Sequence, residues 1–105
     1  MITEKFANHV GYSDVNPFEV VKVVSDKTVE VREMEAIEDP SVKMNFVPGG
    51  FSAICTNNRD QKWDIKPDTT ASVIRIRLGK NGWKDKYGRK FVLSSTPVKY
   101  YDYNF

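Results

Sequence analysis

The chain has 105 residues, of which 40% are hydrophobic and 12% aromatic, a composition that is typical of a globular domain and excludes an intrinsically disordered chain. Sixteen Lys and Arg residues against 14 Asp and Glu residues leave a net charge of +2, which does not by itself indicate a nucleic-acid or membrane partner. With one cysteine and one histidine, an intramolecular disulfide and a Cys/His zinc site within one chain are excluded.

The length fits one domain, which we place over residues 1–105. The start, MITEKFANHV, lacks the apolar segment of a signal peptide, and the apolar runs are far shorter than the ~20 residues of a membrane-spanning helix. Together with the lone Cys55, these features predict a cytoplasmic protein with no membrane partner. Residues 1–10 are expected to be a mobile N-terminal segment, because chain ends are usually poorly ordered.

Apolar residues recur with a period close to two over most of the chain, which is typical of β-strands. The segment PFEVVKVV, residues 17–24, predicts a first long strand. A polar turn at residues 25–27 leads to TVEVREMEAI, residues 28–37, and the two segments predict a hairpin.

The second strand of this hairpin changes its apolar parity between Val31 and Met34. A β-bulge near Arg32 or Glu33 would return the apolar residues to one face, and bulges also bend small sheets toward closure. The segment DPSVKMNFVPGG, residues 39–50, contains two prolines and a Gly-Gly pair and therefore predicts a long loop.

Three further segments have the pattern of strands. FSAICT and QKWDI, residues 51–56 and 61–65, flank four turn-forming residues and predict a second hairpin. SVIRIRL, residues 72–78, alternates Ile74 and Ile76 with arginines and predicts a strand with one apolar and one cationic face. After two polar turns, FVLSS at residues 91–95 predicts another strand.

The C-terminal residues VKYYDYNF, 98–105, predict a last strand in which Tyr101, Tyr103 and Phe105 share one face. Burial of these rings is expected to anchor the chain end and to close the sheet. About six or seven short strands in a chain of this length favour an all-β fold, namely a small antiparallel barrel of SH3-like character, with a compact β-sandwich as the alternative.

The sequence lacks the residue sets that usually carry catalysis. His9 falls in the N-terminal segment without a strand to orient it, and a general base needs fixed geometry. Cys55 ends an apolar segment and is expected to be a buried thiol that behaves as a small hydrophobe. We therefore expect no catalytic residue, no cofactor and no metal site, and a protein that is not an enzyme.

A first candidate site combines the polar loop before the first strand with the QKW segment. A tyrosine, a tryptophan and an amide are suited to a shallow pocket for a peptide or small ligand. In the alternative interpretation, Tyr12 packs on the sheet and Asp14 or Ser13 bonds local backbone. The candidate ligand-binding residues are Tyr12, Asp14, Gln61 and Trp63.

A second candidate site is the basic stretch over residues 75–90, where aromatic residues are interleaved with cations. Cations that follow a nucleic-acid backbone and aromatic rings that stack on bases are the usual elements of such sites. Against it, Asp85 dilutes the positive charge and Trp83 is equally suited to a core. The candidate nucleic-acid-binding residues are Arg75, Arg77, Lys80, Trp83 and Arg89.

Several segments resemble small proteins of unassigned function encoded by phages and prophages. The similarity spans residues 11–105 and is carried by GYSDVNPFEVVKVVSDKTVEVR, VPGGFSAIC, QKW, KNGWKDKYG and VKYYDYNF. The resemblance implies a biological setting and no chemistry. The sequence therefore predicts a non-catalytic binding module of phage or prophage type that acts on a protein or small-ligand partner, with a nucleic-acid-binding accessory protein as the alternative.

Overall fold

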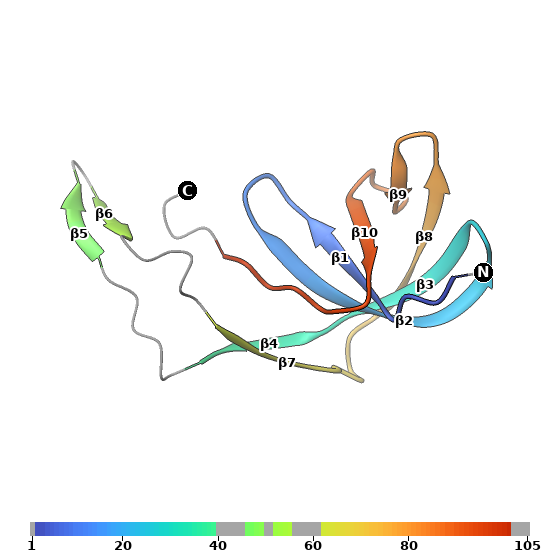
Figure 1. The fold of residues 1–105 in the computed structure, drawn as a ribbon, viewed down its shortest axis with the longest axis horizontal. Coiled ribbons are helices and arrows are strands. Elements are labelled where there is room, and N and C mark those ends of the chain that lie inside the picture. The colour runs from blue at the N-terminus through green and yellow to red at the C-terminus, as the bar shows by residue number, and fades with distance from the viewer. Residues whose placement is uncertain (1, 40–45, 50–51, 56–61, 102–105) are drawn as a thin grey trace.

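The computed structural model describes residues 2–39, 46–49, 52–55 and 62–101. These residues form strands, turns and irregular connections, so the fold is all-β (Figure 1). None of them lies in a helix that could cross a membrane. The strands are β1 (Phe6–Val10), β2 (Val15–Ser25), β3 (Thr28–Glu33), β4 (Glu35–Glu38), β5 (Phe46–Gly49), β6 (Ser52–Cys55), β7 (Trp63–Lys66), β8 (Val73–Gly79), β9 (Gly82–Lys84) and β10 (Lys90–Ser94).

Six of these strands close into a barrel in the order β1-β10-β9-β8-β3-β2. All the pairings are antiparallel, and closure gives every barrel strand a neighbour on both sides. Closure covers the strand edges along the paired stretches, and covered edges do not invite aggregation. The small antiparallel barrel of SH3-like character is confirmed, in place of the sandwich alternative.

The core lies inside the barrel and follows the alternation of the strands. Val29 of β3 pairs with Ile76 of β8, and both side chains are fully buried, as is Val31. The rings of Phe18 and Phe91 pack edge to face with their centroids 5.1 Å apart, a favoured aromatic geometry. The apolar face predicted for the strand at residues 72–78 is therefore the inner face of β8.

The first hairpin forms from β2 and β3, but only residues 28–33 of its predicted second strand pair with β2, since residues 35–37 pair with β7. Its irregularities also lie elsewhere than predicted. Its register shifts fall on β2, around Val21 and Val24, so the bulge expected near Arg32 or Glu33 is wrong. On the partner strand the change of parity coincides with a break, because β3 ends before Met34. Met34 is 7% exposed, and its backbone N–H donates to the Pro17 carbonyl at 3.0 Å.

The N-terminal segment differs from the expectation, because residues 6–10 are strand β1 of the barrel. Ala7 is fully buried in the core. His9 is half-buried, and its ring centroid lies 5.3 Å from that of Phe91 and 6.4 Å from that of Phe18. His9 therefore has fixed surroundings, contrary to the expectation for a mobile N-terminal segment.

Strands β4 and β7 pair with each other and form a two-stranded arm that continues from β3 away from the barrel (Figure 1). Strand β6 pairs with β5, so β5 lies within the predicted loop of residues 39–50. The predicted hairpin between residues 51–56 and 61–65 is wrong, because β6 and β7 have other partners. The burial predicted for Cys55 concerns a side chain outside the described part of the structure.

The segment after β10 is held against the barrel by the amide of Asn8, which is 5% exposed. Its Nδ2 donates to the Thr96 carbonyl at 3.2 Å, and its Oδ1 accepts the backbone N–H of Val98 at 2.9 Å. The side chain thus satisfies backbone groups of a segment that has no strand partner there. Farther along, Lys99 Nζ donates to Asn16 Oδ1 and lies 5.4 Å from the ring centroid of Trp63 in the arm.

The predicted terminal strand is reduced to one bridge within the described residues. Tyr100 and Val15 exchange two backbone hydrogen bonds of 2.9 Å. Tyr101 is 48% exposed, so the burial predicted for it is wrong, while Tyr103 and Phe105 lie outside the described residues. The barrel is closed by β1 rather than by the chain end.

Candidate functional site

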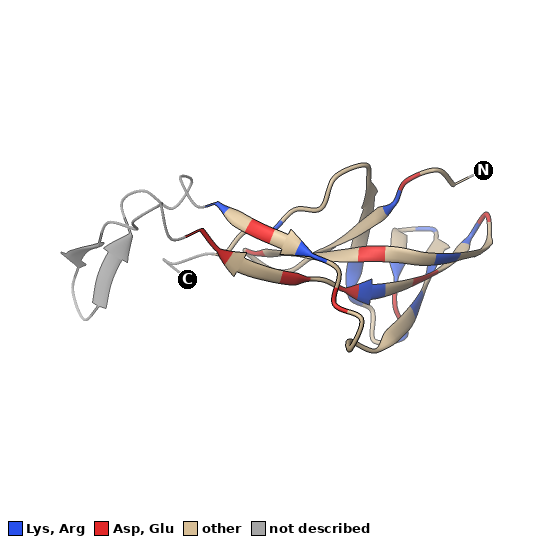
Figure 2. Ribbon diagram, turned by 90° about the horizontal axis from the view of Figure 1, so that it is seen from below, with Lys and Arg blue, Asp and Glu red and all other residues tan. Residues whose placement is uncertain are grey.

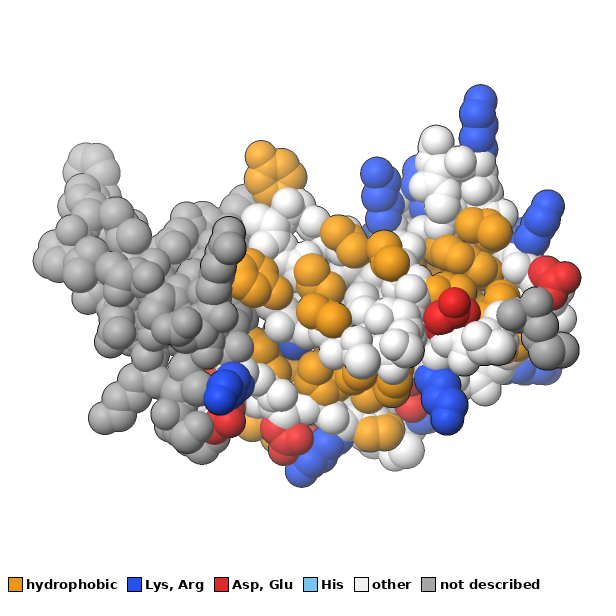
Figure 3. Space-filling view, in the orientation of Figure 1, with side chains coloured by type: hydrophobic (Ala, Val, Ile, Leu, Met, Phe, Trp, Pro, Cys, Tyr) orange, Lys and Arg blue, Asp and Glu red, His pale blue; other side chains and the backbone are white. Residues whose placement is uncertain are grey.

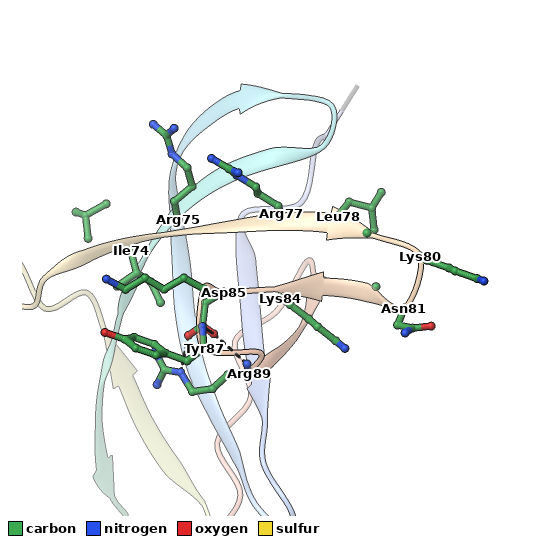
Figure 4. Close-up of a pocket in the computed structure, with 14 residues that line it drawn as sticks. Ile74, Arg75, Arg77, Leu78, Lys80, Asn81, Lys84, Asp85, Tyr87 and Arg89 are labelled. Carbon is green, nitrogen blue, oxygen red and sulfur yellow. Dashed lines mark hydrogen bonds and ion pairs between the residues drawn. The ribbon is translucent and has the colours of Figure 1, made fainter.

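A groove of about 740 Å³ runs along one edge of β8 (Figure 4). It exists because β9 has only three residues and its last residue, Lys84, pairs with Arg77. The chain then leaves the sheet and returns at Lys90, so β8 residues 73–76 have no β9 residue opposite them. Side chains from both faces of β8 line the groove, together with the β8–β9 turn and the loop at residues 85–89.

The groove is strongly cationic. Its charged lining comprises six cations against one carboxylate, namely Arg75, Arg77, Lys80, Lys84, Lys86 and Arg89 against Asp85. Ile74 and Leu78 add apolar surface. Lys and Arg side chains project from the part of the molecule over β8 and β9 (Figure 3). Of the five predicted nucleic-acid-binding residues, four therefore lie in one groove.

The register places three cations in a row across neighbouring strands. Arg77 of β8 is opposite Lys84 of β9, and Lys84 is opposite Lys90 of β10. Directly opposed residues share one face of a sheet, and like charges in such positions destabilise it. This cation row, Arg77-Lys84-Lys90, is thus unfavourable for folding.

Two of the cations in the groove have carboxylate partners. Arg75 Nη2 lies 3.0 Å from Glu30 Oε2 of β3, and Arg89 Nε lies 2.6 Å from Asp85 Oδ2. Among the residues that the structure describes, Arg77, Lys80, Lys84 and Lys86 form no ion pair with a carboxylate. Figure 4 shows Arg75 and Arg77 on one side of β8, with Tyr87 and Arg89 across the ribbon from them.

Asp85 organises the loop at residues 85–89. Its side chain is 3% exposed, and its Oδ1 accepts the backbone N–H groups of Tyr87 and Arg89, each at 2.9 Å. Burial raises the pKa of Asp85, but the hydrogen bonds from Arg89 and Tyr87 outweigh it and place the pKa below its ordinary value. Gly88 has a φ of 84°, which suits glycine in this tight loop. Asp85 therefore positions the loop in addition to diluting the positive charge.

The two aromatic residues near the groove have different roles. Trp83 is half-buried and packs against the core cluster, so it is not a groove residue and its place among the binding candidates is not supported. Tyr87 lines the groove and is 75% exposed. Lys86 Nζ lies 5.0 Å from its ring centroid. Lys84, Lys86 and Tyr87 also line the groove, although they are not among the five predicted residues. Strand register places Lys84 there, and the loop at residues 85–89 places Lys86 and Tyr87.

The first candidate set is spread over different elements. Tyr12, 94% exposed, and Asp14 lie in the β1–β2 turn, which is closed by a 2.9 Å hydrogen bond from the Gly11 N–H to the Asp14 carbonyl. Tyr12 is therefore not buried against the sheet. Trp63 is half-buried at the start of β7, and Gln61 lies outside the described residues. The groove contains none of the described members of this set, and their ligand-binding role stays a prediction.

Charged residues of the loop at residues 85–89 affect the pKa of His9 in strand β1. Burial lowers the pKa of His9, and the positive charge of Arg89 acts in the same direction. The carboxylates of Asp14, Asp85 and Glu33 oppose this effect but do not cancel it. His9 is thus held in its neutral form more firmly than a free histidine.

Comparison of the chain with protein-family models, with curated proteins and with solved structures finds no match.

Proposed function

We propose that the groove along β8 binds nucleic acid through its phosphates, and that the protein is a non-catalytic nucleic-acid-binding accessory protein. The observation that carries the proposal is the cation row Arg77-Lys84-Lys90 across β8, β9 and β10, of which Arg77 and Lys84 line the groove. Such a row lowers the stability of the sheet. Residues that oppose stability are characteristic of functional sites, and phosphate groups are the partner that a row of cations fits.

The distribution of charge supports an anionic partner better than the net charge does. The chain as a whole is nearly neutral, with a net charge of +2, because acidic residues lie elsewhere. In the arm, Glu35, Glu38, Asp39 and Asp64 outnumber Lys62 and Lys66 (Figure 2). An anionic polymer is therefore directed to the groove and away from the arm.

The resemblance to phage and prophage proteins supplies the setting for this proposal. In that setting the protein contacts nucleic acid stoichiometrically rather than transforming it. The groove contains arginine and lysine side chains, one exposed aromatic ring and an ion-paired carboxylate, which suit binding. We propose further that the protein is not an enzyme.

A salt titration tests the proposal with a labelled oligonucleotide of about 12 nucleotides, a length within the ~4–16 that small barrels cover. Four groove cations lack a described carboxylate partner, so the plot of log affinity against log salt is expected to have a slope of roughly −3, at about −0.7 per phosphate of a single strand. The double variant Arg77→Ala with Lys84→Ala should reduce this slope by about 1.4 in magnitude. Absence of binding at about 50 mM salt, within the range where phosphate contacts are strong, would refute the proposal.

The control removes the same number of positive charges from the arm, by Lys62→Ala with Lys66→Ala. Lys66 is opposite Glu35 and is ion-paired with Asp64 at 3.3 Å, so this variant should bind as the natural chain does. The groove variant should also unfold at an equal or higher temperature, because it relieves repulsion between opposed cations. Equal losses of affinity in both variants would mean that only overall charge matters.

A further inference from the structure

The edge of β8 that faces the groove presents backbone groups as well as charges. Leu78 donates its backbone N–H to the Lys27 carbonyl, on the β3 side, at 2.8 Å. Because backbone groups alternate in direction along a strand, those of Arg77, Arg75 and Val73 point to the other side. Strand β9 ends opposite Arg77. The N–H and C=O groups of Arg75 and Val73 are therefore directed to the groove with no β9 residue to pair them.

Tyr87 presents an aromatic ring to the same groove on a loop that is held in place. Its backbone N–H bonds to Asp85, whose other oxygen binds Arg89, and the ring itself is largely exposed. An exposed ring contributes little to the core, whereas a fixed ring beside cations is suited to stack on a base. The groove thus offers three kinds of contact at once, namely cations for phosphates, a ring for a base face and backbone groups for a base edge.

We infer that the groove selects single-stranded nucleic acid over duplex, with an unpaired base stacked on Tyr87 and its edge at the backbone of Arg75 and Val73. In a duplex the base faces are stacked and the pairing edges are occupied, so neither the ring nor the open strand edge gains a partner. A single strand supplies both, while its phosphates reach Arg77 and Lys84. This inference rests on the proposed function and specifies its ligand.

The test compares four ligands at one salt concentration: a single strand, the same sequence as a duplex, a strand of equal length whose sugar-phosphate backbone has no bases, and an extended Glu-rich peptide. The single strand is expected to bind at least about tenfold more tightly than the duplex and the base-free strand, since stacking of one base contributes a factor of this order. On binding, the backbone N–H groups of Arg75 and Val73 should exchange more slowly with solvent.

Variants of the ring sharpen the test. Tyr87→Ala is expected to weaken single-strand binding by about tenfold or more and to leave binding of the base-free strand unchanged. Tyr87→Phe keeps the ring and should restore binding. Tyr101→Ala, which removes a half-exposed tyrosine outside the groove, is the control and should bind normally. Thermal melting of each variant verifies that it is folded.

The outcomes distinguish the inference from the proposed function. If the duplex or the base-free strand binds as tightly as the single strand, or if Tyr87→Ala has no effect, the groove recognises phosphates only: the inference is then wrong and the proposed function stands. If the Glu-rich peptide binds best and displaces the single strand, the occupant is an acidic peptide added to the β8 edge, and the inference and the proposed function both fail. If no anionic ligand binds, both also fail.

Discussion

The arm and the β8–β9–β10 part of the barrel pair their charges in opposite ways. In the arm, Glu35 of β4 is opposite Lys66 of β7, and between β3 and β8 Glu30 is opposite Arg75, a cation of the groove. Such opposite-charge neighbours stabilise a sheet. In the β8–β9–β10 part, Arg77, Lys84 and Lys90 oppose one another across three strands. Cross-strand charge pairs therefore stabilise the sheet in the arm and between β3 and β8, whereas they destabilise it across β8, β9 and β10.

The two regions also differ in packing. Barrel strands have two neighbours each and surround buried side chains such as Ile76. The arm strands β4 and β7 have one neighbour each among the described strands, and Ile37 of β4 is 49% exposed. The barrel therefore supplies the rigid frame on which the β8 edge and its cations are fixed, whereas the arm contributes less to stability.

The largest expected effect comes from one substitution made in both regions. Ile76→Ala removes a fully buried side chain and is expected to lower the free energy of unfolding by roughly 2–5 kcal/mol. Ile37→Ala removes the same atoms from a half-exposed site in the arm and should cost less than about 1 kcal/mol. Chemical denaturation of the two variants measures the difference. Equal losses would break the comparison, because the arm would then be packed as tightly as the barrel.

The second effect concerns Asn8, which holds the segment that joins the barrel to the arm through Lys99 and Trp63. Asn8→Ala deprives Val98 and Thr96 of their partners and is expected to cost about 1–3 kcal/mol, the usual penalty for unsatisfied buried polar groups. Asn81→Ala, at the exposed β8–β9 turn, is the matched control and should change stability by less than about 0.5 kcal/mol. Thermal melting gives both values.

Amide hydrogen exchange in the arm tests whether Asn8 links the arm to the barrel. If the segment links the two regions, exchange of the β4 and β7 backbone N–H groups should accelerate more in Asn8→Ala than exchange in β3 and β8. A uniform acceleration would mean that Asn8 stabilises the whole barrel and has no special effect on the arm.

Much of the barrel could be predicted because its strands alternate clearly. The hairpin of β2 and β3 and the two faces of β8 follow from apolar residues at every second position. Strand β1 was missed because its sequence, FANHV, does not alternate apolar and polar side chains. The buried amide of Asn8 is hydrogen-bonded to Thr96, 88 residues away in the chain. A local sequence pattern cannot indicate so distant a partner.

The pairing of β7 was mispredicted for a related reason. Adjacent strands usually form hairpins, yet β7 pairs with β4 across the intervening β5–β6 unit. The groove was predicted in part: Arg75, Arg77, Lys80 and Arg89 could be grouped from their nearness in the chain. The register between β8 and β9 places Arg77 opposite Lys84 and turns Trp83 toward the core. The composition of the turns does not determine this register.

The smallest expected effect is a pH dependence that separates the barrel from the arm. His9 is the only histidine of the chain, and burial and Arg89 place its folded-state pKa below the ordinary 6.5. As the pH falls below 6.5, the unfolded chain therefore takes up a proton before the folded chain does, and stability is lost progressively until the pH has passed the folded-state pKa. The loss should be seen in barrel strands β1 and β10, while the arm, with no histidine in β4 or β7, should follow only through its link to the barrel.

Denaturation of the natural chain and of His9→Gln between about pH 7 and 5, where carboxylates stay mostly ionised, tests this pH dependence. The natural chain should lose stability over the range and His9→Gln should not; a decline of equal size in both would assign the effect to carboxylates and would contradict a neutral His9 in the barrel.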